Sequence, residues 1–146
     1  MQVHQALVPA VRLELLPKST IDVFISVLEN DGIESCVAAA SIAASAALAD
    51  AGIEMFGLVV ACAAVSAHRG TPSVQSFTSS FIRQSTVDKD VWLDPTEEEV
   101  RQGRGTFMLA CMPALGSITS VWQTGAMPPQ EVIQVRGFWQ CHPWQG

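Results

Sequence analysis

A chain of 146 residues has the length of one domain, so we expect a single hydrophobic core. Hydrophobic residues make up 49% of the chain and charged residues 15%, which excludes the highly charged composition of disordered proteins. The formal net charge is −6 with only 8 Lys and Arg, which argues against tight independent binding to nucleic acid, because phosphate contacts depend on cationic side chains.

Two pieces near the start of the chain alternate apolar and polar side chains, residues 11–15 and residues 21–28. This period of two is typical of half-buried strands. Residues 17–19 interrupt the alternation, and the turn pair Asp31-Gly32 follows it. The pattern predicts a β-hairpin with one half-buried face.

Residues 33–50 are dense in Ala, which has the highest intrinsic helix propensity, and Gly52 follows as a C-terminal stop. Small residues on most faces predict a central helix that is covered on both sides. The longest apolar stretch, residues 36–52, is interrupted by Ser41 and Ser45. We therefore expect no membrane-spanning segment and no membrane partner.

A continuous apolar run of strand length covers residues 56–65 and is typical of a strand buried on both faces. The composition then changes abruptly. Residues 66–90 are rich in Ser, Thr, Gln and Gly and have no steady period, so we expect a loop insertion there.

The rest of the chain predicts three short strands, at residues 91–93, 106–112 and 117–123, which would form a β-meander. Residues 97–104 read as a charged connection that includes a helical turn. Residues 128–135 begin like a helix, with prolines ahead of the first turn.

Four cysteines are scattered along the chain, at Cys36, Cys62, Cys111 and Cys141. None belongs to a CxxC pair, so we expect buried apolar thiols in a reducing compartment. Cys141 stands directly beside His142, but adjacent residues rarely serve together as ligands. The sequence predicts no metal site and no cofactor.

Four segments occur in a fixed order along the chain. They are LPKSTIDV at residues 16–23, LENDG at residues 28–32, ALADAGIEM at residues 47–55, and LDPTEEE at residues 93–99 leading to Met112-Pro113. In this order they resemble the RNase PH family, and most closely its non-catalytic, Mtr-type ring subunits of the eukaryotic RNA exosome.

The resemblance implies an α+β fold of the RNase PH type, shared with domain 2 of ribosomal protein S5, in which a mixed sheet packs on a central Ala-rich helix. In the family, a first half with further strands and a basic helix precedes the first matching segment. We therefore interpret residues 1–135 as a partial RNase PH-like domain with a loop insertion at residues 66–90. Residues 136–146 form an atypical tail.

The resemblance also implies where a catalytic site would lie. Active members cleave RNA from its 3′ end with inorganic phosphate and need carboxylates for a metal ion and a Thr-Arg type pair for phosphate. Here Val100 and Thr106 stand where Asp is usual, and Glu34 and Ser35 follow the Asp-Gly turn. Glu34 would repel phosphate at a helix start, so we interpret it as a cap or first-turn charge. These degenerate positions predict that the chain has no catalytic residue and is not an enzyme.

Charged residues cluster after the Leu-Asp-Pro-Thr segment. Three consecutive carboxylates at residues 97–99 predict a solvated turn, because consecutive side chains do not converge on one ion. Arg101 and Arg104 follow them and are the candidates for RNA contact in an assembled ring.

The function that the resemblance implies is structural. The chain would join other RNase PH-like subunits in a hexameric ring whose pore threads RNA, and so support 3′ to 5′ RNA processing and decay, including rRNA maturation. Residence in the nucleus, nucleolus and cytoplasm follows from the same resemblance. Two alternatives stay open: a phosphate-dependent 3′ to 5′ exoribonuclease, and a truncated product without function.

Overall fold

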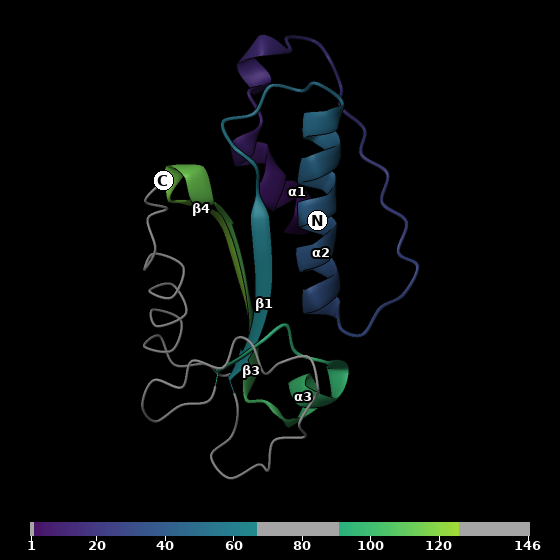
Figure 1. Ribbon diagram of the computed structural model, residues 1–146, viewed down its shortest axis with the longest axis vertical. Coiled ribbons are helices and arrows are strands. Elements are labelled where there is room, and N and C mark those ends of the chain that lie inside the picture. Colours follow the sequence, from purple (N-terminus) through teal and green to yellow (C-terminus); the bar gives the residue numbers. More distant parts are fainter. Residues whose placement is uncertain (1, 67–90, 126–146) are drawn as a thin grey trace.

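The computed structural model describes residues 2–66 and 91–125 (Figure 1). The α-helices are α1 (Gln2–Leu7), α2 (Ile33–Asp50) and α3 (Glu97–Gln102), and the strands are β1 (Val60–Ser66), β2 (Val91–Leu93), β3 (Gly105–Met112) and β4 (Ser117–Gly125). Short 3-10 helices are η1 (Val8–Ala10), η2 (Leu13–Leu15) and η4 (Pro113–Leu115). The predictions for residues 67–90, 128–135 and 136–146, and for Cys141, lie outside the described residues.

The strands form one sheet in the order β2-β1-β3-β4, and every pairing among the described residues is antiparallel. Helices α1 and α2 lie along one face of this sheet (Figure 1). The predicted α+β fold is confirmed, but the sheet in this part of the chain is antiparallel and not mixed. The predicted β-meander is wrong, because β1 lies between β2 and β3.

Helix α2 begins and ends where the sequence predicted. Gly32 precedes it with a φ of 145°, and Gly52 follows it in the left-handed region with a φ of 72°. The N–H of Gly52 donates to the carbonyl of Ala49, and the N–H of Ile53 donates to the carbonyl of Leu48. These two bonds form a Schellman motif, so Gly52 is the predicted stop.

One face of α2 is buried and the opposite face is exposed. The buried residues recur every three or four positions, at Ala38, Ser41, Ala44, Ser45 and Leu48. Ile33 and Ile42, on other faces, are 63% and 40% exposed. The prediction of a helix covered on both sides is wrong: small side chains permit close packing on every face, and the sheet occupies only one.

Among the described residues, α2 is long and apolar enough to cross a membrane when judged by length and composition. Its contacts, however, are with β1, α1 and β3, and Ser41 and Ser45 are buried in them. These contacts are those of a core helix.

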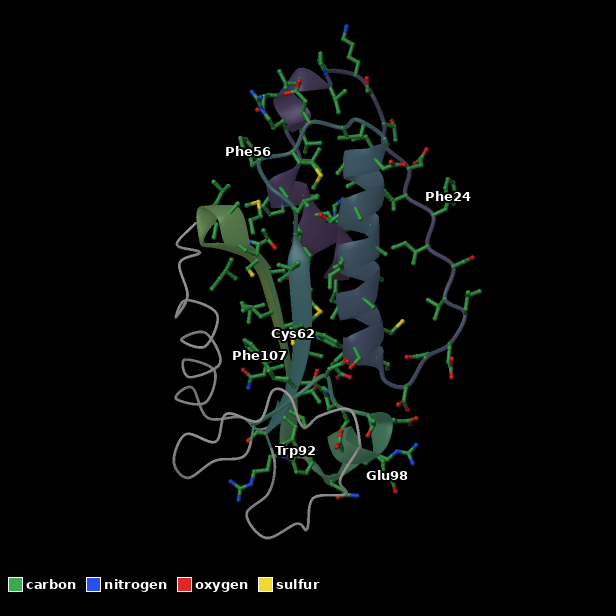
Figure 2. The ribbon with its side chains drawn as sticks, in the orientation of Figure 1. Phe24, Phe56, Cys62, Trp92, Glu98 and Phe107 are labelled. Carbon is green, nitrogen blue, oxygen red and sulfur yellow. The ribbon has the colours of Figure 1, made fainter. Side chains whose placement is uncertain are left out.

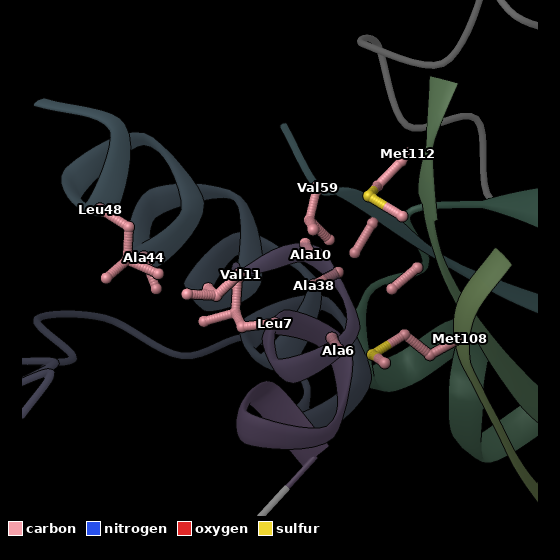
Figure 3. Close-up of a cluster of buried hydrophobic side chains, with 12 residues drawn as sticks. Ala6, Leu7, Ala10, Val11, Ala38, Ala44, Leu48, Val59, Met108 and Met112 are labelled. Atoms are coloured by element: carbon pink, nitrogen blue, oxygen red, sulfur yellow. The ribbon is translucent and has the colours of Figure 1, made fainter. Parts of the chain in front are cut away.

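The core lies between the helices and the sheet (Figure 3). Strand register places Ala61 opposite Ala110, and both side chains belong to the buried cluster. The cluster gathers side chains from α1, η1, α2, β1, β3 and the connections beside them: Ala6, Leu7, Ala10, Val11, Ala38, Ala44, Leu48, Val59, Ala61, Met108, Ala110 and Met112. Strand β1 begins four residues later than the start of the predicted run at residue 56, and Val59 is already buried before the strand begins.

The predicted hairpin at residues 11–28 is wrong. Val11 forms an isolated antiparallel bridge with Met55, and the N–H of Arg12 donates to the carbonyl of Glu54 at 3.0 Å. The chain then turns through η2, and residues 20–31 run past α2 without a strand partner in the described residues (Figure 1). The first predicted strand therefore pairs with the connection that follows α2.

A buried hydrogen bond joins α2 to the entry of β1. The N–H of Val59 donates to Ser45 Oγ at 2.8 Å, and both residues are almost fully buried. Ser41 lies one turn earlier on the same face, but its hydroxyl donates to the carbonyl of Val37 within the helix at 2.8 Å. Only the Ser45 hydroxyl satisfies a backbone donor of another element.

Replacing Ser45 with Ala leaves the buried Val59 N–H without an acceptor, so we expect a loss of about 1–3 kcal/mol in the free energy of unfolding. Ser41→Ala is the matched control, because it removes a bond internal to the helix, and its expected cost is below about 1 kcal/mol. Urea unfolding followed by circular dichroism measures both. Equal costs for the two variants would contradict the assignment.

Candidate functional site

The start of α2, the connection from β2 to α3, and the start of β3 meet at one end of the sheet (Figure 1). The hydroxyl of Ser35 donates to the carbonyl of Pro95 at 3.2 Å. The hydroxyl of Thr106 donates to Glu34 Oε1 at 2.8 Å. We call these four residues the α2 cluster. It brings together three of the four positions that the sequence predicted to be degenerate, while Val100, half-buried in α3, makes none of these hydrogen bonds.

Glu34 is held by a hydrogen bond from the sheet. Thr106 is 4% exposed, and its hydroxyl reaches the carboxylate across 72 positions of sequence. Gly32 occupies the N-cap position and provides no side chain there, so Glu34 is a first-turn charge and not a cap. A carboxylate in the first turn also interacts favourably with the helix dipole. The position that the resemblance predicted for phosphate binding therefore carries a carboxylate that accepts a hydrogen bond from Thr106.

Helix α3 is stabilised by a capping box that the sequence analysis missed. Glu99 N–H donates to Thr96 Oγ1 at 3.4 Å, and Thr96 N–H donates to Glu99 Oε2 at 2.9 Å. The Thr-x-x-Glu spacing was the signal for it. Glu97 instead accepts from Arg101, and Glu98 is exposed (Figure 2). Glu97 and Glu99 therefore have different partners. Among residues 2–66 and 91–125, no group of three or more possible metal ligands occurs.

The two predicted RNA-contact residues differ in their surroundings. Arg101 forms an ion pair with Glu97, with 2.6 Å between Nη2 and Oε1, and both side chains are more than half exposed. Exposed pairs of this kind contribute little to stability. Arg104 is also exposed, and its backbone N–H donates to the carbonyl of Ser66 at 3.0 Å. Within the described part of the chain, no ion pair involves the Arg104 guanidinium. Arg104 is therefore more available than Arg101 for a contact with phosphate.

Two cysteines lie on the sheet with protonated thiols. Burial, together with the smaller effect of the negative charge of Asp94, raises the pKa of the Cys62 thiol from 9.0 to about 11 (Figure 2). Burial also raises the pKa of Cys111. The reactive form of cysteine is the thiolate, so these shifts oppose a nucleophilic role. Cys111 is buried as predicted, whereas Cys36 and Cys62 are half-buried.

The chain matches known proteins over most of its length. Residues 1–54 match the RNase PH family, described as "3' exoribonuclease family, domain 1". Exosome complex component mtr3 of Schizosaccharomyces pombe is 33% identical over 132 residues, which cover 89% of this chain and 44% of that protein. Exosome complex component Rrp41 of Methanopyrus kandleri is 38% identical over 130 residues, covering 89% of this chain and 45% of that protein.

A plant relative and a solved structure of a rice protein are also similar to this chain. Exosome complex component RRP41-like of Arabidopsis thaliana is 35% identical over 122 residues, covering 84% of this chain and 39% of that protein. The crystal structure of rice Rrp46 superposes with a TM-score of 0.56 at 22% identity, over 76% of this chain and 44% of that chain. This likeness shows the fold alone.

The antiparallel sheet with two helices on one face, together with these matches, defines a partial RNase PH-like domain. The chain belongs to the RNase PH family, and the relatives that it matches are exosome components of eukaryotes and archaea. It spans less than half the length of these relatives. The resemblance predicted from the four segments is confirmed.

The prediction that the chain is not an enzyme is contradicted. The matching family is described as a 3′ exoribonuclease family. Several relatives carry the name Rrp41, whereas the prediction assumed an Mtr-type subunit. The prediction rested on Glu34, Ser35, Val100 and Thr106.

The hydrogen bond between Thr106 and Glu34 gives a testable coupling. Thr106→Val keeps the shape of the side chain and removes the donor, and Glu34→Ala removes the acceptor. We expect a double-mutant cycle in urea unfolding to give a coupling energy of about 1.5 kcal/mol, because hydrogen bonds to charged groups exceed neutral ones. Glu98→Gln is the control and should show no coupling with Thr106→Val. Additive effects of the first pair would contradict the contact.

The raised pKa of Cys62 predicts an alkaline loss of stability. The thiol holds its proton more tightly in the folded chain than in the unfolded one. Its contribution to the free energy of unfolding is therefore complete below pH 9 and is lost as the pH rises towards about 11. Unfolding free energies measured across this range should fall with pH. Cys62→Ala should flatten the fall, and an unchanged slope in that variant would refute the effect.

Proposed function

We propose that this chain acts as an RNase PH-like subunit of an exosome-type assembly that processes and degrades RNA from the 3′ end. The observation that carries the proposal is the extent of its similarity to exosome components. Matches to fission yeast, plant and archaeal components cover between 84% and 90% of the chain. The whole described domain, and not one motif, therefore resembles these proteins.

In this proposal the partners are other RNase PH-like subunits, arranged in a hexameric ring through which RNA is threaded. The RNA processing that the assembly supports would include rRNA maturation. The chain would reside in the nucleus, nucleolus and cytoplasm. The net charge of −6 supports dependence on partners, since a chain with 8 Lys and Arg provides few phosphate contacts of its own. RNA affinity would be a property of the assembly.

Arg104 and Arg101 are the proposed RNA contacts of this chain. Both are exposed at the end of the sheet where α3 leads into β3. Arg104 has no ion-pair partner among the described residues, whereas Arg101 would have to exchange Glu97 for a phosphate. Arg104 would therefore contribute more to binding than Arg101.

Phosphate-dependent 3′ to 5′ exoribonuclease activity is the second candidate. The description of the matching family and the name Rrp41 of several relatives favour it. The residues of the α2 cluster bind one another, and no cation takes part in its hydrogen bonds. Phosphate binding at this place would need positive charge from elsewhere in an assembly.

Affinity purification of the tagged chain from cell extract, followed by sizing and mass spectrometry, tests the first proposal. We expect the 15.6 kDa chain to elute with other RNase PH-like subunits in a large complex. Recovery of the chain alone or as an aggregate would contradict the proposal and favour a truncated product. Release of nucleoside diphosphates from RNA, with and without phosphate, tests the second candidate on the same sample.

RNA binding by the purified complex tests the arginines. Arg104→Gln should weaken binding at every RNA sequence and lower the slope of log affinity against log salt by about 1. Lys18→Gln is the matched control, because Lys18 follows η2, and η2 lies at the opposite end of the ribbon from α3 (Figure 1). An equal effect of both substitutions would show that Arg104 has no specific role.

A further inference from the structure

Arg104 combines an exposed side chain with a backbone that is held on both sides. Its N–H donates to the carbonyl of Ser66 at 3.0 Å, which ties the residue to the end of β1. In the register of the sheet, the next residue, Gly105, lies opposite both Ser66 and Gly125, the last residue of β4. The backbone at Arg104 is therefore enclosed between β1 and β4, and only its side chain reaches solvent.

Gly125 packs directly on the peptide group that follows Arg104. A Cβ atom at Gly125 would lie 2.7 Å from the carbonyl oxygen of Arg104 and 2.8 Å from the Cα atom of Gly105. Side chains do not approach backbone atoms this closely, so any other residue at position 125 would push the Arg104 peptide away. The φ of Gly125 is 85°, in the left-handed region that glycine adopts without strain. Position 125 therefore requires glycine for two separate reasons.

Gly103 makes a second close contact, on the other side of Arg104 in the sequence. It is the C-cap residue of α3, and a Cβ atom there would overlap Cγ2 of Val65 on β1 and lie 3.3 Å from the carbonyl oxygen of Ser66. Val65 is fully buried, so its side chain has no room to turn aside. The φ of Gly103 is −77°, which any residue adopts, so it is the close contact that requires a glycine.

We propose that Gly103 and Gly125 are positioning residues for the Arg104 guanidinium, and that they fix the point at which this cation meets an RNA phosphate. The inference rests on the proposed function, which gives Arg104 its RNA contact. Neither glycine has a side chain that could bind RNA, so both act through the backbone from which the Arg104 side chain leaves. A backbone that is held before binding lowers the entropic cost of ordering the contact.

The arrangement suits a phosphate group and not a nucleobase. A guanidinium binds the oxygens of a phosphate through paired N–H donors. Within the described part of the chain, no ion pair involves Arg104, and the glycines that hold it have no side chains that could select a base. Contacts to phosphate position an RNA without reading its sequence. The expected ligand is therefore the backbone of a single-stranded RNA of any sequence.

The test compares two glycine substitutions in the purified assembly that contains the chain. Gly125→Ala adds the methyl group that meets Arg104. Gly116→Ala is the matched control, because Gly116 has a φ of 60° and nothing lies within 4 Å of its Cβ position. Both substitutions place alanine in the left-handed region, so they share the backbone strain and differ in the contact. The probe is single-stranded oligoadenylate, and its affinity is measured across a range of salt concentrations.

We expect Gly125→Ala to weaken binding of the probe by about threefold to tenfold and to lower the slope of log affinity against log salt, as Arg104→Gln does. Added to Arg104→Gln, Gly125→Ala should cause no further loss, because the contact that it disturbs is already absent. Gly116→Ala should bind the probe as the parent chain does. A role of Gly125 in stability alone predicts the opposite: additive losses, and equal effects of the two alanine substitutions.

A second pair of variants covers the case in which Gly125→Ala does not enter the assembly. Gly103→Ala should weaken binding of the probe to a similar extent. Val65→Ala in the same chain should restore the affinity, because the methyl groups that it removes make room for the added one. Val65→Ala alone is the control and should keep the salt slope of the parent chain.

The outcomes separate this inference from the proposed function. If Arg104→Gln weakens binding and Gly125→Ala does not, or if their losses add, the inference is overturned while the proposed function stands. A loss in Gly103→Ala that Val65→Ala fails to reverse has the same meaning. If Arg104→Gln has no effect, the inference fails together with the proposed Arg104 contact. Failure of the parent chain to enter a large complex in cells would overturn both proposals.

Discussion

The close approach of α2 to β1 is the contact on which the other parts of this domain depend. Ala38 and Ala44 on the helix and Ala61 and Ala63 on the strand are all buried, so short side chains hold the two elements near each other. Close packing of this kind tolerates little change in volume. The hydrogen bond from Val59 to Ser45 fixes the helix at the point where the chain enters the sheet.

The candidate site follows from that arrangement. With α2 fixed along the sheet, its first turn lies over the start of β3, and Glu34 meets Thr106 there. The same turn meets the connection before α3, where Ser35 donates to the carbonyl of Pro95. The site is therefore a consequence of helix placement, and it carries more carboxylates than cations. Phosphate contact at this cluster would therefore need positive charge that its own residues do not provide.

Local patterns in the sequence predicted the local structure well. The Ala-rich run gave α2 with its limits, and the strand-length runs at residues 106–112 and 117–123 gave β3 and β4, because propensity and turn residues act over a few positions. The contact of Glu34 with Thr106 spans 72 positions and leaves no local signal. The hairpin prediction failed because residues 21–28 have a strand pattern without a partner in the described chain, and alternation cannot reveal where a partner lies.

Residues 20–31 have a consequence for the life of the free chain. Within the described part of the chain these residues make no backbone hydrogen bond, and extended backbone of this kind fits readily into the cleft of a protease. The stretch is therefore open to cleavage in the free chain.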